Sequence, residues 1–228
     1  WGRGFALVVR GVVARGLAAP DHAAKLLDDA IGYAERTGQP LLIGMARTLR
    51  GLVALDMGDP QAAQEQAELV LNVVEGHGVL EPAQVGPRAL LAGAYYAQGD
   101  LERAEAVLER IAAEADAPSV LFPRRLAVAH YAAVLLEQGR VREALEWASR
   151  AERVPAEDVR SRVVSARVLA RALAAVGDLE QAMIVADEAV RLAHATEQVS
   201  ERPAADVVRR RIAEAAGSGA EGSGRARS

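Results

Sequence analysis

Cysteine is absent from this 228-residue chain, and aromatic residues are rare, with two Trp, four Tyr and two Phe. Without cysteine, the chain has no disulfides, thiolate zinc sites or cysteine nucleophiles. No apolar run approaches the roughly 18 residues that a membrane span needs, and the first residues do not form a signal peptide. We therefore expect a cytoplasmic protein that makes no contact with membranes.

The chain also lacks an excess of positive charge. It has 27 basic and 31 acidic residues, for a net charge of −4, which argues against direct binding of a nucleic-acid backbone. Alanine, in contrast, is abundant, with 49 residues, and 26 of the 27 basic residues are arginine. Small side chains favour closely packed helices and make a β-rich fold improbable.

A small residue recurs about every 40 positions, with spacings of 40, 41, 40 and 38. These anchors are Ala18, Gly58, Gly99, Gly139 and Gly177. Seven positions before them stand Gly11, Gly51, Ala92, Ala132 and Ala170, and five positions after them stand Ala23, Ala63, Ala104, Ala144 and Ala182. Columns that keep one period over five units indicate internal repeats.

Each repeat is typical of two antiparallel helices joined by a tight turn. Around Gly99, apolar residues follow helical spacing on both sides, and Asp100 is placed to cap the second helix. The small columns would let the two helix backbones approach closely. The predicted helices are 3–17, 20–36, 41–57, 60–75, 83–98, 101–115, 121–138, 141–153, 157–176, 179–196 and 203–216. The predicted repeats are 1–40, 41–81, 82–118, 119–155 and 156–198, followed by a cap at 200–216 and a flexible tail at 217–228.

These residues resemble the tetratricopeptide repeat (TPR) family over about residues 2–196. The matching residues are Leu91-Ala92, Tyr95, Gly99-Asp100 and Ala104 in the third repeat, and Leu169-Ala170, Leu173, Gly177-Asp178, Ala182 and Ala189 in the fifth. The period is near 40 rather than the family's 34, and the tryptophan that begins each family repeat is missing. The longer period resembles the arrays of MalT-like and LuxR-type bacterial regulators and of cyclase or ATPase fusions in high-GC bacteria. The resemblance implies an all-α, right-handed α-solenoid of about five hairpins plus a C-terminal capping helix, spanning 1–216.

No catalytic or metal-binding pattern is found. The four histidines fall in four different repeats and lack a second ligand at helical spacing. Residues 217–222 match the dinucleotide-binding fingerprint in letters, but no strand precedes them. The run Arg209-Arg210-Arg211 is interpreted as the solvated face of a cap whose Val208 and Ile212 cover the last repeat. We expect a non-enzymatic protein without cofactor or metal.

Charges separate between the two helices of each repeat. The first helices carry twelve arginines and four acidic residues, whereas the second helices carry eight basic and nineteen acidic residues. Because first helices line the groove in the family, the resemblance implies an electropositive groove under an acidic outer layer. The groove residues that it implies are Phe5, Arg15, Thr48, Leu52, Leu55, Tyr96, Leu136, Arg167 and Arg171. The same spacing also selects Val8, Val12, Met45, Ala89, Gly93, Leu126, Ala129 and Ala133.

Arg167 and Arg171 lie one helical turn apart, so they could present two guanidinium groups to the same carboxylate or phosphate. We therefore expect a regulatory domain that binds a protein, an acidic and apolar peptide or another ligand in this groove, as the sensor or interaction part of a bacterial transcriptional regulator. The alternative is an assembly scaffold that uses the apolar groove as a homodimer interface. The identity of the ligand, the oligomeric state and the flanking domains stay open.

Overall fold

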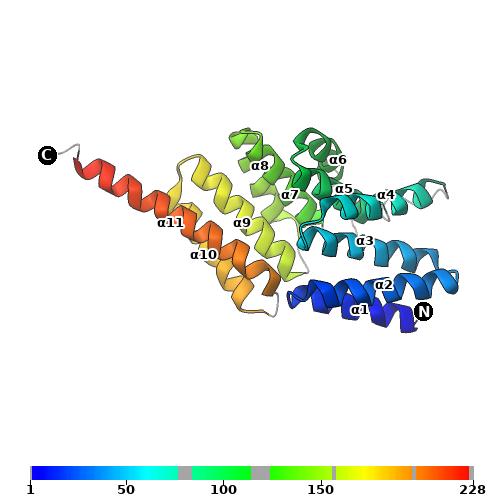
Figure 1. Cartoon of the computed structure of the whole chain (residues 1–228). Helices are drawn as coiled ribbons and strands as arrows, with labels where there is room; N and C mark the ends of the chain where they lie inside the picture. The colour runs from blue at the N-terminus through cyan, green and yellow to red at the C-terminus, as the bar shows by residue number, and fades with distance from the viewer. Residues whose placement is uncertain (1, 77–83, 114–123, 156–157, 197–198, 226–228) are drawn as a thin grey trace. The chain divides into compact units, whose positions relative to one another are not determined.

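The computed structural model describes all residues except 1, 77–83, 114–123, 156–157, 197–198 and 226–228 (Figure 1). The described residues form helices and turns, without a strand. The helices are α1 (Gly2–Gly16), α2 (Pro20–Arg36), α3 (Pro40–Asp56), α4 (Pro60–Gly76), α5 (Val85–Gln98), α6 (Leu101–Ala113), α7 (Arg124–Glu137), α8 (Val141–Arg153), α9 (Val159–Ala175), α10 (Leu179–His194), the 3₁₀ turn η2 (Val199–Glu201) and α11 (Arg202–Arg225). The fold is therefore a TPR-like all-α solenoid, as the sequence predicts.

The helices form two compact units. Unit 1, Trp1–Phe122, holds the three hairpins from α1 to α6, and unit 2, Pro123–Ser228, holds α7 to α10, η2 and α11. The boundary between the units lies near the predicted junction of the third repeat (82–118) and the fourth repeat (119–155). Each unit is described by itself below.

The five anchor residues all form the same left-handed turn. The φ angles are +56° at Ala18, +76° at Gly58, +80° at Gly99, +77° at Gly139 and +88° at Gly177. At Gly99, two backbone hydrogen bonds close the helix end: the amide of Gly99 donates to the carbonyl of Tyr96, and that of Asp100 donates to Tyr95. This pair of bonds is the Schellman motif, which requires a residue that tolerates positive φ.

Aspartates after these turns begin the next helices. The side chains of Asp59, Asp100 and Asp178 accept hydrogen bonds from the backbone amides three residues later, at 3.0–3.2 Å. Pro60 occupies the first position of α4, where its missing N–H costs nothing. The predicted turn chemistry is confirmed.

The small-residue columns lie where helices cross. Ala23, Ala63, Ala104, Ala144 and Ala182 are all fully buried. In unit 1, a Cβ added to Gly51 of α3 would lie 2.3 Å from a methyl of Leu90 on α5, and one added to Gly11 of α1 would lie 2.8 Å from Leu27 on α2. These columns therefore set the spacing between helices, because a larger side chain has no room.

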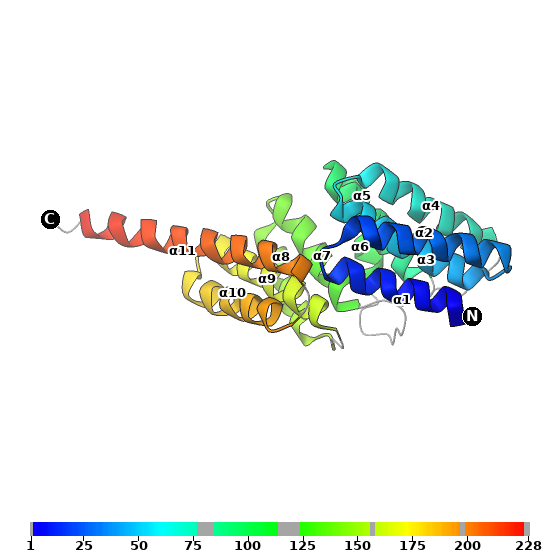
Figure 2. The same ribbon diagram turned by 60° about the horizontal axis from the view of Figure 1, so that its bottom comes forward.

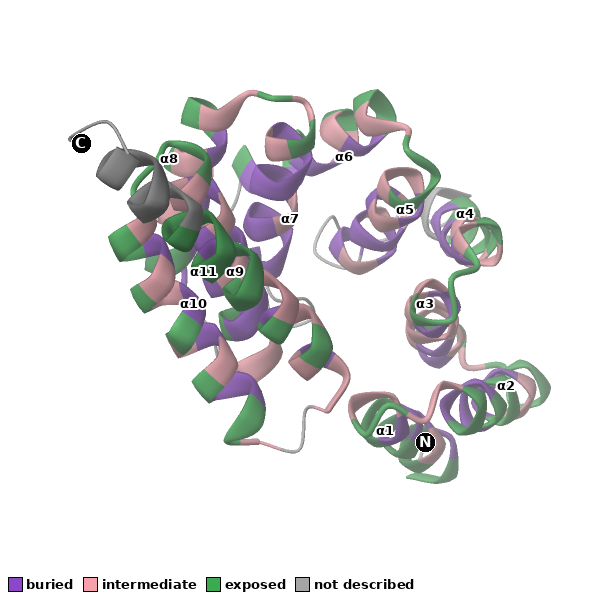
Figure 3. Ribbon diagram, turned by 60° about the vertical axis from the view of Figure 1, so that its left-hand side comes forward, coloured by how far each residue is buried: buried purple, intermediate pink, exposed green. Residues whose placement is uncertain are grey.

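In unit 2, α7 is buried along most of its length (Figure 3). The ring of Tyr131 packs edge-to-face against Trp147 of α8, with centroids 5.0 Å apart. Arg125 is also buried; its Nε donates to Ser165 Oγ of α9 at 2.7 Å, and its guanidinium pairs with Glu152 of α8. A buried arginine thus ties α7 to both of its neighbours.

The last helix departs most from its predicted bounds. The sequence predicts a helix over 203–216 and a flexible tail over 217–228, whereas α11 continues to Arg225. Its first turns pack on α10, with Ile212 buried against Ala170, Ala182 and Ala186. Its C-terminal turns extend past α10 (Figure 2).

Candidate functional site

The first helices of the repeats contact one another within each unit. In unit 1, α3 contacts both α1 and α5, and in unit 2, α9 contacts both α7 and α11. Side chains from successive first helices therefore form a continuous layer in each unit, the inner layer. Of the nine principal groove residues that the sequence predicts, six lie in unit 1 and three lie in unit 2.

In unit 1, the apolar candidates are partly accessible. Leu52 and Leu55 of α3 pack with one side against the core cluster that contains Ala54 and Leu90. Tyr96 of α5 is half-buried, whereas Phe5 of α1 is 46% exposed. These side chains leave apolar surface available on the inner layer of unit 1.

The polar candidates of unit 1 are already engaged within the chain. Arg15 of α1 forms a two-pronged ion pair with Asp56 at the end of α3, with its Nη2 2.9 Å from Oδ1. The hydroxyl of Thr48 donates to the carbonyl oxygen of Gly44 at 2.8 Å. The ion pair of Arg15 therefore joins α1 to α3, whereas the bond of Thr48 lies within α3.

Five residues selected by the groove spacing are buried in the core, and for these the prediction is wrong. They are Val8, Ala89, Leu126, Ala129 and Ala133, all less than 9% exposed. Within each unit, neighbouring first helices contact one another, and this contact covers side chains that the spacing had assigned to the groove. Val12 is 46% exposed, and Met45 and Gly93 are half-buried, which leaves these three accessible.

In unit 2, the two arginines of α9 bind different carboxylates. Arg171 Nη2 lies 2.6 Å from Glu137 Oε1 at the end of α7, and Arg167 Nη1 lies 3.4 Å from Glu201 Oε2 of η2. The sequence predicts that both face one ligand carboxylate, but each already holds a carboxylate of the chain. The third candidate of unit 2, Leu136, is half-buried on α7.

Glu201 is the centre of a buried charge cluster. Its side chain is only 9% exposed and also accepts a hydrogen bond from Arg160 Nε at 2.7 Å. Burial, together with the nearby charges of Arg171 and Arg160, lowers the pKa of Arg167. Burial also lowers the pKa of His130 of α7 to about 4, with Arg160 and Arg167 adding to the effect. His130 is therefore neutral at physiological pH and contributes no charge to this cluster.

Ion pairs within the chain neutralise much of the positive charge that the first helices carry. In the described part of the chain, at least eight of the twelve first-helix arginines pair with carboxylates. Four of these pairs join a first helix to a second helix, such as Arg50 of α3 to Asp28 of α2 at 3.0 Å. The inner layer is consequently less electropositive than its count of arginines indicates.

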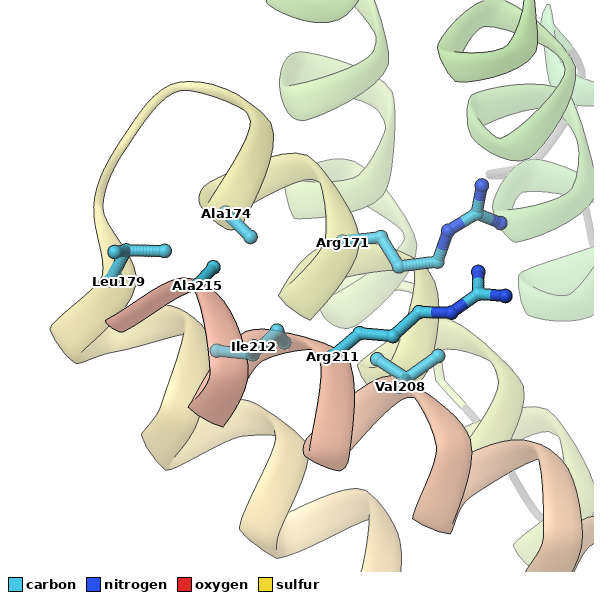
Figure 4. Close-up of a pocket in the computed structure, with 7 residues that line it drawn as sticks. All are labelled: Arg171, Ala174, Leu179, Val208, Arg211, Ile212 and Ala215. Atoms are coloured by element: carbon cyan, nitrogen blue, oxygen red, sulfur yellow. The ribbon is translucent and has the colours of Figure 1, made fainter. Parts of the chain in front are cut away.

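The structure also brings together residues that the sequence patterns did not combine. Arg211 of α11 and Arg171 of α9 line one pocket of about 200 Å³ in unit 2 (Figure 4). The sequence places Arg211 only on a solvated face, although it follows Arg171 by 40 residues, which is the period of the repeats. The sequence signal for this pair is the spacing of 40 residues, which places Arg211 at the position in the last helix that is equivalent to Arg171 in the fifth repeat.

Within the described part of the chain, no group of three or more His, Cys, Asp or Glu residues is arranged to hold a metal ion. Among the described helices, none is long and apolar enough to span a membrane.

Comparisons with known proteins identify the repeat. The sequence model of the tetratricopeptide repeat matches residues 85–110, 126–150 and 163–183. A comparison with curated proteins finds no significant match. The matched segments correspond to the third, fourth and fifth predicted repeats.

Three solved structures share the fold. A thermophilic TPR protein of Thermus thermophilus has 21% identity and a TM-score of 0.64, over 93% of this chain and 98% of that one. The nearly identical TPR-like repeats of a Podosopora anserina protein, described as a kinesin light chain, have 21% identity and a TM-score of 0.59, over 85% and 95%. NprR in complex with its cognate peptide NprX has 14% identity and a TM-score of 0.74, over 93% of this chain and 62% of NprR. Three of the five predicted repeats thus match the tetratricopeptide repeat model, and most of the chain shares the fold of TPR structures.

Proposed function

We propose that this chain is a non-enzymatic regulatory domain that binds a protein or peptide along its first helices. The observation that carries the proposal is the accessible apolar surface of Leu52, Leu55 and Tyr96 on the inner layer of unit 1. The fold shared with NprR, whose structure contains its cognate peptide, supports a peptide as the partner.

The expected partner presents apolar residues to the inner layer of unit 1 and carries acidic residues beside them. Burying one Leu or Tyr side chain contributes about 1.5–3 kcal/mol, whereas an exposed ion pair contributes about 0–1 kcal/mol. Because Arg15 of unit 1 already holds Asp56, an acidic partner would have to displace this internal pair. Affinity therefore rests on the apolar contacts, while Arg15 tunes association and orientation.

A peptide selection tests this function directly. A phage-displayed library of random 12-residue peptides is panned against the whole chain, and the selected peptides are synthesised for fluorescence binding measurements. We expect the selected sequences to combine Leu, Ile or Phe with Asp or Glu. The double variant Leu52→Ala with Tyr96→Ala should weaken their binding at least about tenfold, chiefly through faster dissociation.

Leu69→Ala is the matched control, because Leu69 is an exposed leucine on the second helix α4. It should leave the affinity within about twofold. The proposal fails if the double variant binds the peptides as wild type does, or if Leu69→Ala weakens binding as strongly.

We infer further that this binding is regulatory and that the domain serves a bacterial transcriptional regulator. This role rests on the period near 40, which resembles the arrays of such regulators. Cells that carry the double variant Leu52→Ala with Tyr96→Ala should show altered levels of a defined set of transcripts, measured by RNA sequencing. An unchanged transcript profile would reject the regulatory role and leave peptide binding intact.

A homodimer scaffold is the second candidate, and the surface of α1 favours it. Phe5, Val9, Val12 and Val13 are each more than 40% exposed on this helix. An apolar helix face of this kind is typical of an interface. Light scattering over a hundredfold range of concentration should then give a mass that rises from one to two copies, and Val9→Asp with Val13→Asp should abolish the rise.

A further inference from the structure

The pocket in unit 2 combines apolar walls with two cationic groups. Its walls come from three helices: Ala174 of α9, Leu179 of α10, and Val208, Ile212 and Ala215 of α11. Val208 and Ile212 belong to the core that fixes α11 on α9 and α10. The walls are therefore part of the packed helix interface and are set by the fold itself.

The two arginines come from different helices. Figure 4 shows the guanidinium groups of Arg171 and Arg211 extending toward the same side of the pocket. Arg171 shares its charge with Glu137 at 2.6 Å. Arg211 is exposed and forms no ion pair with any residue in the described part of the chain, unlike Arg209, which pairs with Asp187 at 2.5 Å. One full positive charge beside the apolar walls thus has no counter-charge from the described residues.

We propose that this pocket binds a small free carboxylic acid with an aliphatic stem. The planar guanidinium group offers two parallel donors that match a carboxylate, and Arg211 is available for this contact. The volume of about 200 Å³ lies below the roughly 300–1,000 Å³ of common small-molecule sites, which limits the stem to a short one. The inference goes beyond the proposed function, because its ligand is a small molecule rather than a polypeptide.

The first measurement is calorimetric titration of the whole chain with 4-methylpentanoate at low ionic strength. 4-Methylpentanamide has the same stem without the charge, and acetate has the charge without the stem. We expect both to bind at least about tenfold more weakly than 4-methylpentanoate, because each lacks one of the two contacts. Equal binding of the amide, or of acetate or inorganic phosphate, would overturn the proposal.

Variants locate the binding to this pocket. Arg211→Gln should weaken binding of 4-methylpentanoate about tenfold or more. It should keep the helix content and melting temperature of wild type, since Arg211 is exposed. Arg210→Gln is the matched control: Arg210 is the neighbouring residue, is 68% exposed and lies 4.0 Å from Glu214. It removes the same charge and should leave the affinity within about twofold.

Glu137→Gln supplies a test of opposite sign. Removing this carboxylate releases Arg171 from its internal pair, so the affinity for 4-methylpentanoate should rise severalfold. The proposal is overturned if Arg211→Gln and Arg210→Gln have equal effects, or if Glu137→Gln weakens binding.

Two further arms separate this site from peptide binding. A synthetic peptide that ends in leucine presents the same stem and carboxylate. If it bound through Arg211 more tightly than the free acid, the assignment to a free acid would be wrong. The double variant Leu52→Ala with Tyr96→Ala should bind 4-methylpentanoate as wild type does, because both substitutions lie in unit 1. Failure of the peptide selection would therefore leave this result unaffected.

Discussion

At the scale of single residues, the recurring Gly and Ala positions were predictable from the sequence. Each one is required by the same close helix crossing, and this crossing recurs once in every repeat. The pairing of the arginines was not predicted, although some of the paired residues are separated by about one repeat period. Arg15 and Asp56 are 41 residues apart, as are Arg160 and Glu201, while Arg171 and Glu137 are 34 apart. The two pairs separated by 41 residues join similar positions of adjacent repeats, whereas Arg171 and Glu137 do not. Composition alone counts such charges but does not reveal which of them are neighbours in space.

Ala104→Leu tests the crossing of α5 and α6. Ala104 is fully buried, so three additional carbon atoms must displace neighbouring side chains. We expect the free energy of unfolding to fall by about 1–3 kcal/mol in urea melts. Ala106→Leu is the control on the same helix, because Ala106 is exposed, and it should change stability by less than about 0.5 kcal/mol. Equal effects of the two substitutions would mean that the column does not mark a helix crossing.

The left-handed turns give a pair of substitutions with opposite signs. Ala18 holds φ of +56°, which costs a residue with a Cβ about 1–2 kcal/mol, and it is exposed. Ala18→Gly should therefore raise the melting temperature, with a gain of up to ~1 kcal/mol after the added entropy of the unfolded chain. Gly99→Ala should lower the free energy of unfolding by about 1 kcal/mol. A Cβ at this position meets no neighbouring atom, but the alanine would have to adopt the unfavourable φ of +80°. A drop in the melting temperature of Ala18→Gly would show that this turn is not strained.

At the scale of helices, boundaries were predicted well wherever turn chemistry marks them. The predicted bounds of α2 and α8 agree with the structure, because Pro20 or a glycine turn precedes each and a breaker follows. The 3₁₀ turn η2 was missed, since three residues carry no periodicity. This omission also concealed Glu201, the carboxylate that binds Arg160 and Arg167.

Truncation separates the two halves of α11. A chain that ends at Ala216 keeps Ala205 and Ile212, the residues of this helix that are buried in the core. The lost segment contains four glycines, each of which weakens a helix by about 1 kcal/mol relative to alanine. Its removal should leave the melting temperature within ~1 °C in thermal unfolding followed by circular dichroism.

Ending the chain at Arg211 instead serves as the comparison, because it removes Ile212 and exposes the core around Ala170 and Ala182. This second truncation should destabilise the chain by about 2 kcal/mol or more. A large loss already at Ala216 would show that residues after it dock on the rest of unit 2.

At the scale of the whole molecule, the repeats predicted the TPR-like solenoid but not its division into two units. A repeat pattern records which residues are equivalent, and it does not record how well adjacent repeats are packed. The predicted groove residues therefore fall into two sets, with Leu52, Leu55 and Tyr96 in unit 1 and Leu136, Arg167 and Arg171 in unit 2. The apolar part of the candidate site follows from the spacing, whereas the carboxylates that hold its arginines required the tertiary structure.

The helix contacts described above bear on how quickly the chain folds. Each pair of described elements with substantial contact consists of neighbours in sequence or of next neighbours, such as α3 with α5 or α7 with α9. Contact order is consequently low, and little loop-closure entropy is lost before native contacts form. Within each unit, folding can begin in any hairpin and spread to the adjacent one, so an interrupted terminal repeat need not prevent the others from reaching their native state.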